Sequence, residues 1–213
     1  MAFLDLQKLE KGLLALKLPL NQEQVQCLDL FAEYLYRWNR VYNLTAIQNK
    51  DEVLTHHILD SLSLAVMLKK LKGEKALDIL DVGAGGGLPA IPLAICLPDS
   101  KIHMIDAVAK KVAFLRQSIL MLKLPNAQAF HGRVESNLSG QYDVVTSRAF
   151  SSLPNFFNLT QSLMKPSGFW LAMKGTLPTE ELKELDDLAI KYEIYPVKVP
   201  FLEQERHLIR FYK

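Results

Sequence analysis

The sequence predicts an α/β protein with a doubly wound, mainly parallel seven-stranded sheet and an N-terminal helical region. From residue 76 onward, short apolar runs alternate with segments of helical periodicity. That alternation is typical of a parallel sheet with right-handed crossovers. Before about residue 70, the apolar residues recur at helical spacing. We therefore predict a helical region over residues 1–70 and a sheet domain over residues 71–213.

The whole N-terminal region is expected to be helical, and two of its segments show the helical pattern clearly. Asn21 can cap the first, because Gln24 follows three positions later and completes a capping box. Apolar residues then follow at helical spacing, namely Val25, Leu28, Phe31, Leu35 and Trp38. A second segment of helical periodicity covers residues 53–68.

The sheet domain is expected to hold five strands in sequence, followed by a hairpin. The strands are predicted over residues 77–82, 101–106, 127–131, 142–146 and 168–174, with helices near 88–97, 109–122, 152–164 and 179–190. Two further strand-like runs, Tyr192–Val199 and His207–Tyr212, have no helix between them. They must pair antiparallel, because a parallel return needs a long crossover.

The most informative motif is Leu77–Pro98, which reads LDILDVGAGGGLPAIPLAICLP. A buried apolar run closes on Asp81, and a glycine-rich turn with Gly83 and Gly85 follows. Glycines lack the Cβ atoms that would keep the backbone away from a ligand. This order builds a nucleotide or adenosyl site at the carboxyl end of a first strand, although a plain tight turn is the alternative.

The details of the turn decide which cofactor it suits. The dinucleotide-binding pattern G-x-G-x-x-G could start at Gly83 or at Gly85, but its last glycine position is then occupied by Leu88 or by Ala90. No phosphate-binding loop of the G-x-x-x-x-G-K type is present either. The next strand ends on Asp106, whose carboxylate can accept hydrogen bonds from both ribose hydroxyls of an adenosine. The alternative for Asp106 is a helix cap. We interpret the motif as an S-adenosylmethionine site.

A third group follows the third strand, at Gly132, Arg133, Val134 and Glu135. A short side chain and free backbone N–H groups there could hold the adenine edge. Glu135 could equally be a solvated surface residue.

The segment after the fourth strand bears on the acceptor. It reads Ser147-Arg148-Ala149-Phe150 and lacks the Asn/Asp-Pro-Pro-aromatic motif of enzymes that methylate exocyclic amines. Neither cysteine is placed to attack a pyrimidine ring. Both absences favour an acceptor that is already nucleophilic, such as guanine N7, which needs no general base. Arg148 is the expected catalytic residue, holding the cofactor or the guanine O6; a surface ion pair is the alternative.

Basic residues suggest where RNA could bind. Lys174 ends the fifth strand and could contact phosphate, while Arg206 and His207 lie in a basic turn of the final hairpin. A solvated hairpin edge explains that turn equally well. Residues 101–148 hold Lys101, Lys110, Lys111, Arg116, Lys123, Arg133 and Arg148 against only Asp106, Glu135 and Asp143. That imbalance can make a local positive face, although a solvated helix face is the alternative.

Two features of the N-terminal region stay open. Trp38, Asn39 and Tyr42 mix aromatic and polar groups, as RNA-contacting surfaces often do, but aromatics at helical spacing are more often core. His56 and His57 precede Asp60 without further metal ligands at useful spacing. They are expected to be structural or RNA-facing, and no metal is predicted.

Composition sets wider limits. A length of 213 residues with 49% apolar composition suits one good-sized domain with an added subdomain, and a net charge of +2 does not by itself indicate a nucleic-acid partner. Cys27 and Cys96 imply neither a disulfide framework nor a zinc site. The longest apolar stretch, Leu88–Pro98, is too short to span a bilayer, and no secretory signal is evident, so a cytoplasmic location without a membrane partner is expected.

Six motifs in order resemble the ribosomal small-subunit methyltransferase G family, also called glucose-inhibited division protein B. The central motif is DVGAGGGLPAIPLAI; YNLTAI and HHILDSLSL precede it, and SRAF, MKG and ERHLIRFYK follow it. The resemblance implies transfer of a methyl group from S-adenosylmethionine to N7 of one guanine in small-subunit (16S) rRNA, free or in the 30S subunit. It also implies cofactor contacts at Gly83, Leu88, Asp106, Val134, Glu135 and Arg148, which Gly85 joins from the glycine-turn argument. A different acceptor, or a non-catalytic RNA-binding or assembly factor on the same fold, remains an alternative.

Overall fold

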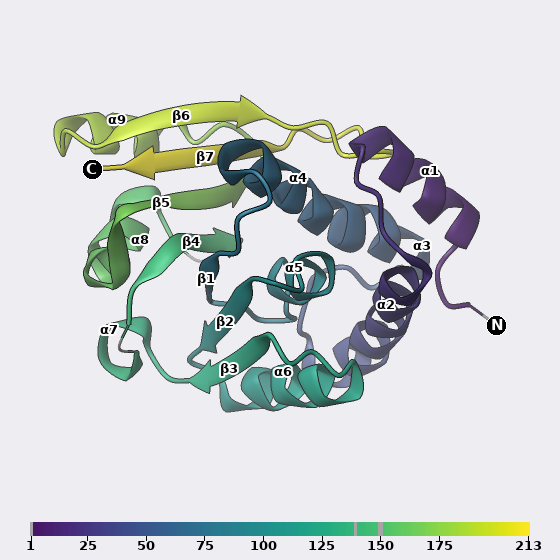
Figure 1. Cartoon of the computed structure of the whole chain (residues 1–213). Helices are drawn as coiled ribbons and strands as arrows, with labels where there is room; N and C mark the ends of the chain where they lie inside the picture. Colours follow the sequence, from purple (N-terminus) through teal and green to yellow (C-terminus); the bar gives the residue numbers. More distant parts are fainter. Residues whose placement is uncertain (1, 139, 149–150) are drawn as a thin grey trace.

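The computed structural model describes residues 2–138, 140–148 and 151–213, so Ala149 and Phe150 of the predicted strand-end motif lie outside the described residues. Its centre is a seven-stranded sheet in the order β3-β2-β1-β4-β5-β7-β6 (Figure 1). The strands are β1 Asp78–Val82, β2 Lys101–Asp106, β3 Ala127–His131, β4 Tyr142–Arg148, β5 Met164–Lys174, β6 Lys191–Pro196 and β7 His207–Tyr212. Neighbouring strands from β3 to β5 pair in parallel, and β7 runs antiparallel to both β5 and β6. The predicted α/β class and the antiparallel hairpin are confirmed.

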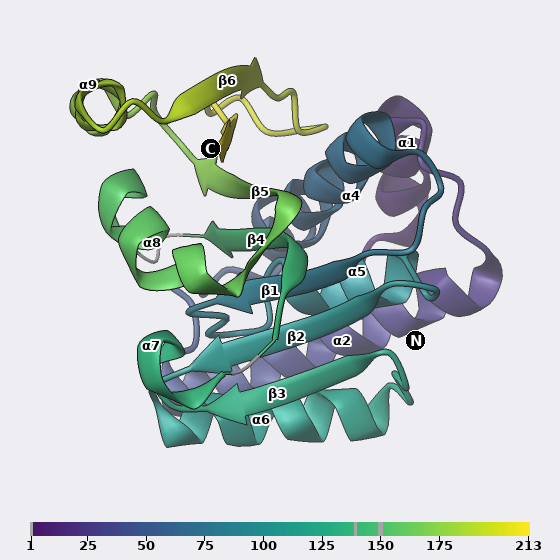
Figure 2. The ribbon, with the colours of Figure 1, turned by 60° about the vertical axis from the view of Figure 1, so that its left-hand side comes forward.

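Helices cover both faces of the sheet. They are α1 Leu6–Leu16, α2 Gln22–Tyr42, α3 Lys50–Val53, a π-helix Leu54–Leu59, α4 Asp60–Lys72, α5 Ala90–Cys96, α6 Ala109–Met121, α7 Val134–Asn137, α8 Leu153–Thr160, a 3₁₀ turn Gln161–Leu163 and α9 Thr179–Asp187. The N-terminal helices pack with α5 and α6 on one face, while α8 and α9 lie on the other (Figure 2).

Strand residues alternate between two hydrophobic clusters, one on each face. In β4, for example, Val144 belongs to the cluster under the N-terminal helices and Val145 to the cluster under α8 and α9. Both side chains are fully buried. Burial on both faces explains why the central strands are almost continuously apolar in sequence.

The N-terminal helices form for the predicted reasons. Asn21 caps α2, because its side chain accepts the Gln24 N–H while the Gln24 side chain accepts the Asn21 N–H. Leu28, Phe31 and Leu35 then point into the core that α2 shares with the sheet. Because that core is continuous from α1 to β7, the division between residues 1–70 and 71–213 stays a prediction.

Three elements differ from the expectations. The segment 54–59 is a π-helix rather than part of a regular α-helix, and α7 was not expected. Strand β5 begins at Met164 rather than residue 168, although Pro166 and Gly168 lie within it. Its register to β4 shifts between Tyr142 and Val144, and such an irregularity tolerates a proline and a glycine.

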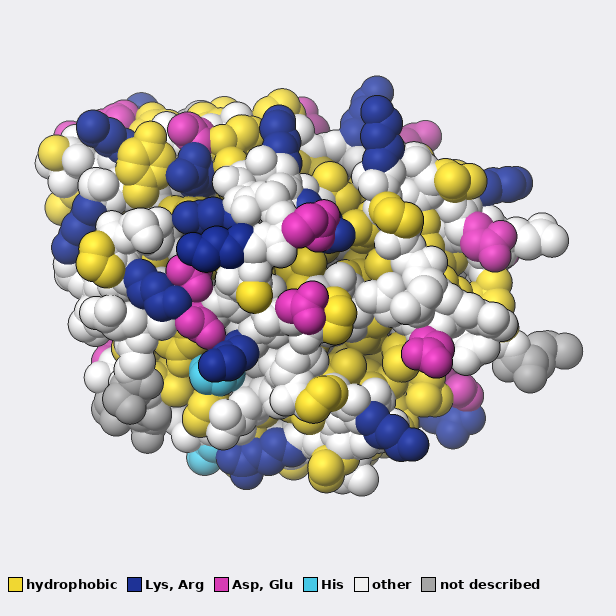
Figure 3. All heavy atoms as spheres, viewed as in Figure 1, with side chains coloured by type: hydrophobic (Ala, Val, Ile, Leu, Met, Phe, Trp, Pro, Cys, Tyr) yellow, Lys and Arg dark blue, Asp and Glu magenta, His cyan; other side chains and the backbone are white. Residues whose placement is uncertain are grey.

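On the face shown in Figure 3, basic and acidic side chains are mixed over the same elements. Within the described residues, no helix combines the length and apolarity needed to cross a bilayer. No group of three or more His, Cys, Asp or Glu side chains among those same residues is arranged to hold a metal ion.

Candidate active site

The glycine turn begins where β1 ends. The backbone N–H groups of Gly83 and Ala84 both donate to the Ile105 carbonyl of β2, at 2.9 and 3.1 Å. Gly85 has a φ of +54°, a left-handed conformation that side chains disfavour. At Gly87 an added Cβ would lie 2.6 Å from the Ile91 side chain of α5. The turn is therefore held tightly between β2 and α5.

Asp106 orders the turn from the neighbouring strand. Its Oδ2 accepts the Gly85 N–H at 2.9 Å, and its Oδ1 accepts the Val108 N–H at 2.8 Å, just before α6. The helix-start role and a ligand role are therefore compatible, since each carboxylate oxygen can accept a second hydrogen bond. Asp106 is 6% exposed at the floor of a cavity.

That first cavity, of about 400 Å³, contains four of the residues predicted to hold the cofactor: Gly83, Asp106, Val134 and Glu135. Val134 is buried and Glu135 exposed at the start of α7, the short helix after β3. Val82 and Ile105 add apolar walls beside the Asp106 carboxylate. An acceptor for paired hydroxyls next to an apolar slot fits an adenosyl group.

A second cavity, of about 710 Å³, adjoins the first and shares Gly83 and Lys111 with it. Its wall contains most of the other predicted site residues, namely Gly85, Leu88, Arg148, Lys174 and Arg206. It also contains residues from the N-terminal region, namely Leu44, Thr45, Ala46, Ile47, Glu52, His56, His57 and Asp60. His207 lies outside this wall, with its Nδ1 2.8 Å from the Gly175 carbonyl oxygen.

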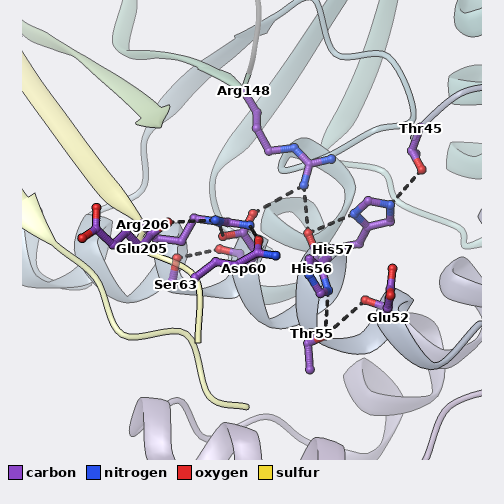
Figure 4. Close-up of polar contacts among 11 residues, drawn as sticks. Thr45, Glu52, Thr55, His56, His57, Asp60, Ser63, Arg148, Glu205 and Arg206 are labelled. Atoms are coloured by element: carbon purple, nitrogen blue, oxygen red, sulfur yellow. Dashed lines mark hydrogen bonds and ion pairs between the residues drawn. The ribbon is translucent and has the colours of Figure 1, made fainter. Parts of the chain in front are cut away.

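Asp60 joins two arginines in the wall of the second cavity (Figure 4). Its Oδ1 lies 3.2 Å from Arg206 Nε and its Oδ2 lies 3.5 Å from Arg148 Nη1. Arg148 also donates to the His56 carbonyl at 3.2 Å. Burial raises the pKa of Asp60, and the two arginines oppose that rise. Burial likewise lowers the pKa of Arg148, against the effect of Asp60. The predicted alternative for Arg148, a surface ion pair, is wrong, because this pair is largely buried.

His57 is held as a neutral imidazole beside this cluster. Its Nδ1 lies 2.9 Å from the His56 carbonyl oxygen and its Nε2 lies 2.9 Å from Thr45 Oγ1. With the carbonyl accepting from Nδ1–H, Nε2 accepts from the Thr45 hydroxyl. Burial and then the nearby Arg148 charge lower the pKa of His57 to about 3.

Asn39 fixes the loop that carries Thr45. Its Oδ1 accepts the Thr45 N–H at 2.8 Å and its Nδ2 donates to the Ile47 carbonyl at 2.8 Å. Asn39 is 5% exposed, and Trp38 packs against the Phe114 ring of α6 with centroids 5.5 Å apart. Of the two open interpretations of Trp38 and Asn39, the core interpretation holds.

Asp81 lies under the glycine turn with both carboxylate oxygens buried and without a hydrogen bond of ordinary geometry from any described residue. Burial raises its pKa well above the usual range, opposed chiefly by the Arg148 charge. The Ala90 backbone N–H at the start of α5 also opposes that rise, and Asp81 lines neither cavity.

The basic residues that line the cavities differ in whether an acidic side chain already pairs with their charge. Lys174 Nζ lies 2.8 Å from Glu181 Oε2, and Arg206 is paired with Asp60, so both charges are offset. Lys111 lines both cavities and makes no ion pair within the described residues. The sequence predicts no role for Glu52 or Thr45, and it marks Asp60 only by its place after the two histidines. Their one sequence signal is their place within or beside the motifs YNLTAI and HHILDSLSL.

Fold and site together define a class I S-adenosylmethionine-dependent methyltransferase. Two solved structures share the fold: a magnesium protoporphyrin IX methyltransferase from Synechocystis with bound S-adenosylmethionine (TM-score 0.62, 16% identity, 91% of this chain and 99% of that one) and an O-methyltransferase from Bacillus cereus in complex with S-adenosylhomocysteine (TM-score 0.62, 14% identity, 87% of this chain and 91% of that one). The family model described as rRNA small subunit methyltransferase G matches residues 24–209, and the chain belongs to that family.

Relatives named ribosomal RNA small subunit methyltransferase G match nearly end to end. The protein from Chromobacterium violaceum is 45% identical over 204 residues, covering 95% of each chain. The protein from Methylibium petroleiphilum is 42% identical over 203 residues, covering 95% of this chain and 92% of the relative.

Proposed function

We propose that this enzyme transfers the methyl group of S-adenosylmethionine to N7 of a guanine in small-subunit (16S) rRNA, in the cytoplasm, with the rRNA or the 30S subunit as its partner. One observation carries the choice of acceptor. Arg148 and a neutral His57 line the second cavity beside the glycine turn, and no thiol is among its lining residues. The names of the relatives support the RNA class.

The cofactor supplies an electrophilic methyl group, and the first cavity supplies the contacts that would hold it. In this proposal Asp106 accepts hydrogen bonds from the ribose hydroxyls, using the lone pairs that the Gly85 and Val108 N–H groups leave free. Val134 and Glu135 flank the adenine edge. Gly83 lines both cavities, and Gly85 and Leu88 line the second.

Guanine N7 suits the second cavity because it needs no base. Its lone pair forms the new bond to the methyl carbon as the bond from that carbon to sulfur breaks, and no proton leaves the ring. Arg148 donates to O6, next to N7, and so orients the base. Asp60 and the His56 carbonyl hold the guanidinium at that position.

Lys174, Arg206 and His207 are proposed as RNA contacts at the mouth of the second cavity. Lys174 and His207 pair across β5 and β7, and Arg206 precedes β7, so the three lie on one edge. Arginine and lysine charges near RNA phosphates add affinity that falls as salt rises. The pairing of Lys174 with Glu181 makes its share the smaller one.

The test uses tritiated S-adenosylmethionine with small subunits from cells that lack the enzyme, followed by mapping of the labelled nucleotide. We expect one labelled guanosine, with strand scission there after borohydride and aniline treatment, as N7-methylguanosine gives. Replacement of that guanine by 7-deazaguanine should abolish labelling. Labelling of a 7-deazaguanine substrate would overturn N7 as the acceptor. Cofactor binding without turnover on any RNA would favour an assembly factor instead.

A further inference from the structure

The second cavity has one acidic side chain that the protein itself leaves unused. Only Glu52 and Asp60 among its lining residues carry carboxylates. Asp60 is committed to Arg148 and Arg206. Glu52 is half-buried, and its carboxylate makes no hydrogen bond or ion pair with any described residue. A carboxylate in a cavity wall without a partner is available to a ligand.

The position of Glu52 is fixed although its carboxylate is not engaged. It lies in α3, which Asn49 caps by accepting the Asp51 N–H, and its own carbonyl accepts the Thr55 hydroxyl at 3.3 Å. Figure 4 shows its side chain rising from α3 on the side of the His57 ring, away from the backbone contact with Thr55. The backbone of Glu52 is therefore anchored while the carboxylate faces the cavity.

Guanine offers two edges of opposite character. The edge with N7 and O6 only accepts hydrogen bonds, whereas the Watson–Crick edge carries the N1–H and N2–H donors. Arginines suit the first edge, and an ionised carboxylate suits the second because it can accept both donors at once. The second cavity provides both groups, with Arg148 on β4 and Glu52 on α3.

Resting on the proposed function, we propose that Glu52 is the specificity-determining residue of the acceptor site, accepting N1–H and N2–H of the target guanine. Enzymes that act on one base commonly take it out of the stack and bind its Watson–Crick edge. Adenine lacks the N2 amino group and has an acceptor at N1, so it would place a lone pair against the carboxylate. A site built to accept N–H groups rejects an analogue that lacks them far better than an apolar site can.

The ordinary explanation for an acidic residue in a first helical turn is a favourable charge near the helix N-terminus. Asp51 is the neighbouring acidic residue of the same turn, is exposed, and does not line the cavity. Asp51→Ala therefore removes the same helix-end charge and leaves the cavity intact, which makes it the matched control.

The experiment compares guanine with hypoxanthine at the mapped position of reconstituted small subunits. Inosine keeps N7, O6 and N1–H but lacks the N2 amino group. For the wild-type enzyme and for Asp51→Ala, we expect kcat/KM to fall about 10- to 100-fold on inosine, the effect of losing one hydrogen bond to a charged group. Glu52→Ala should lose at least about tenfold on guanosine. Its preference for guanosine over inosine should fall below about threefold, since the interacting pair is already broken.

A cofactor-binding measurement and a second substitution at position 52 separate a role in base recognition from a folding defect. Calorimetry should show that Glu52→Ala binds S-adenosylhomocysteine as the wild type does, which excludes a folding defect. Glu52→Gln, of equal size, should also be slow on guanosine because its amide N–H₂ opposes a guanine donor. The proposal is overturned if Glu52→Ala keeps the wild-type preference or the wild-type rate. An error in the proposed acceptor atom gives a different result: the wild-type enzyme would then methylate a substrate that carries 7-deazaguanine.

Discussion

Arg206 and Asp60 lie 146 positions apart in the chain, yet the Nε of Arg206 donates to Oδ1 of Asp60 across 3.2 Å. The pair ties the loop before β7 to the first turn of α4, and Arg148 joins it from the end of β4. One carboxylate from the N-terminal region thereby sets the positions of two cations from separate segments of the C-terminal half of the chain.

Removing the Asp60 charge should destabilise the fold. Asp60→Asn leaves Arg148 buried without its counter-charge, and breaking a buried pair in this way costs about 3 kcal/mol or more. Urea denaturation should show that loss in the free energy of unfolding. The control is Glu33→Gln, which breaks an exposed pair with Arg37 and should cost under about 0.5 kcal/mol. Equal losses in the two variants would show that Asp60 does not hold the cluster.

His57 should make stability depend on pH. Its folded pKa of about 3 lies below the ordinary value of 6.5, so between these values the unfolded chain binds a proton that the folded chain does not. Stability should therefore fall as pH drops from 6.5 toward 3, by up to about 1.4 kcal/mol per pH unit from this group.

Denaturation of wild type and His57→Asn at several pH values isolates this contribution. The stability advantage of the wild type over His57→Asn should shrink on acidification through that window. His131→Asn, at an exposed histidine at the end of β3, should keep the wild-type slope. Parallel curves for wild type and His57→Asn would contradict the buried neutral imidazole.

Asp106 should matter for the cofactor more than for the fold. Asp106→Ala is expected to weaken S-adenosylhomocysteine binding by about 1.5–3 kcal/mol, the range for hydrogen bonds to a charged group, and calorimetry measures this. Loss of the contact to Gly85 N–H adds to the effect by loosening the glycine turn. Asp99→Ala, in the loop before β2 and so at the other end of that strand, is the control. NAD should not bind any of the three proteins.

The salt dependence of RNA binding should separate the lysines. Lys111 makes no ion pair within the described part of the chain, so Lys111→Ala should lower the slope of log K against log salt by about one. Lys174→Ala should lower it less, because Glu181 already offsets that charge. Lys101→Ala, at the start of β2 and away from both cavities, should leave the slope unchanged. A larger effect at Lys174 than at Lys111 would show that Glu181 does not offset the Lys174 charge when RNA binds.

The sheet could be predicted from sequence because its strands are short apolar runs bounded by turn residues. Leu80 and Val82 before the glycine turn, for instance, are both buried in the sheet, as their apolar side chains predict. The start of β5 was missed because Pro166 and Gly168 ordinarily end strands. The π-helix over residues 54–59 was missed because its apolar residues fit an ordinary helix equally well.

The part of the site that could be predicted from sequence is the part formed by neighbouring segments of the chain. The glycine turn and Asp106 follow from consecutive strands, so their meeting at one sheet edge could be inferred. The contact of Asp60 with Arg148 spans 88 positions, and no local pattern encodes such a distance. The same limit explains why Glu52 and Thr45 escaped notice: each lies in a short segment whose cavity wall exists only after folding.

The strand order has a consequence for synthesis of the protein. Strand β6 leaves the ribosome before β7 but pairs only with it, since β7 inserts between β5 and β6. Until β7 arrives, β6 has no backbone partner and the loop with Arg206 cannot reach Asp60. A growing chain could thus form the cofactor turn early, whereas the wall of the second cavity closes last. Nascent molecules would then remain unable to engage an acceptor while they are still being made.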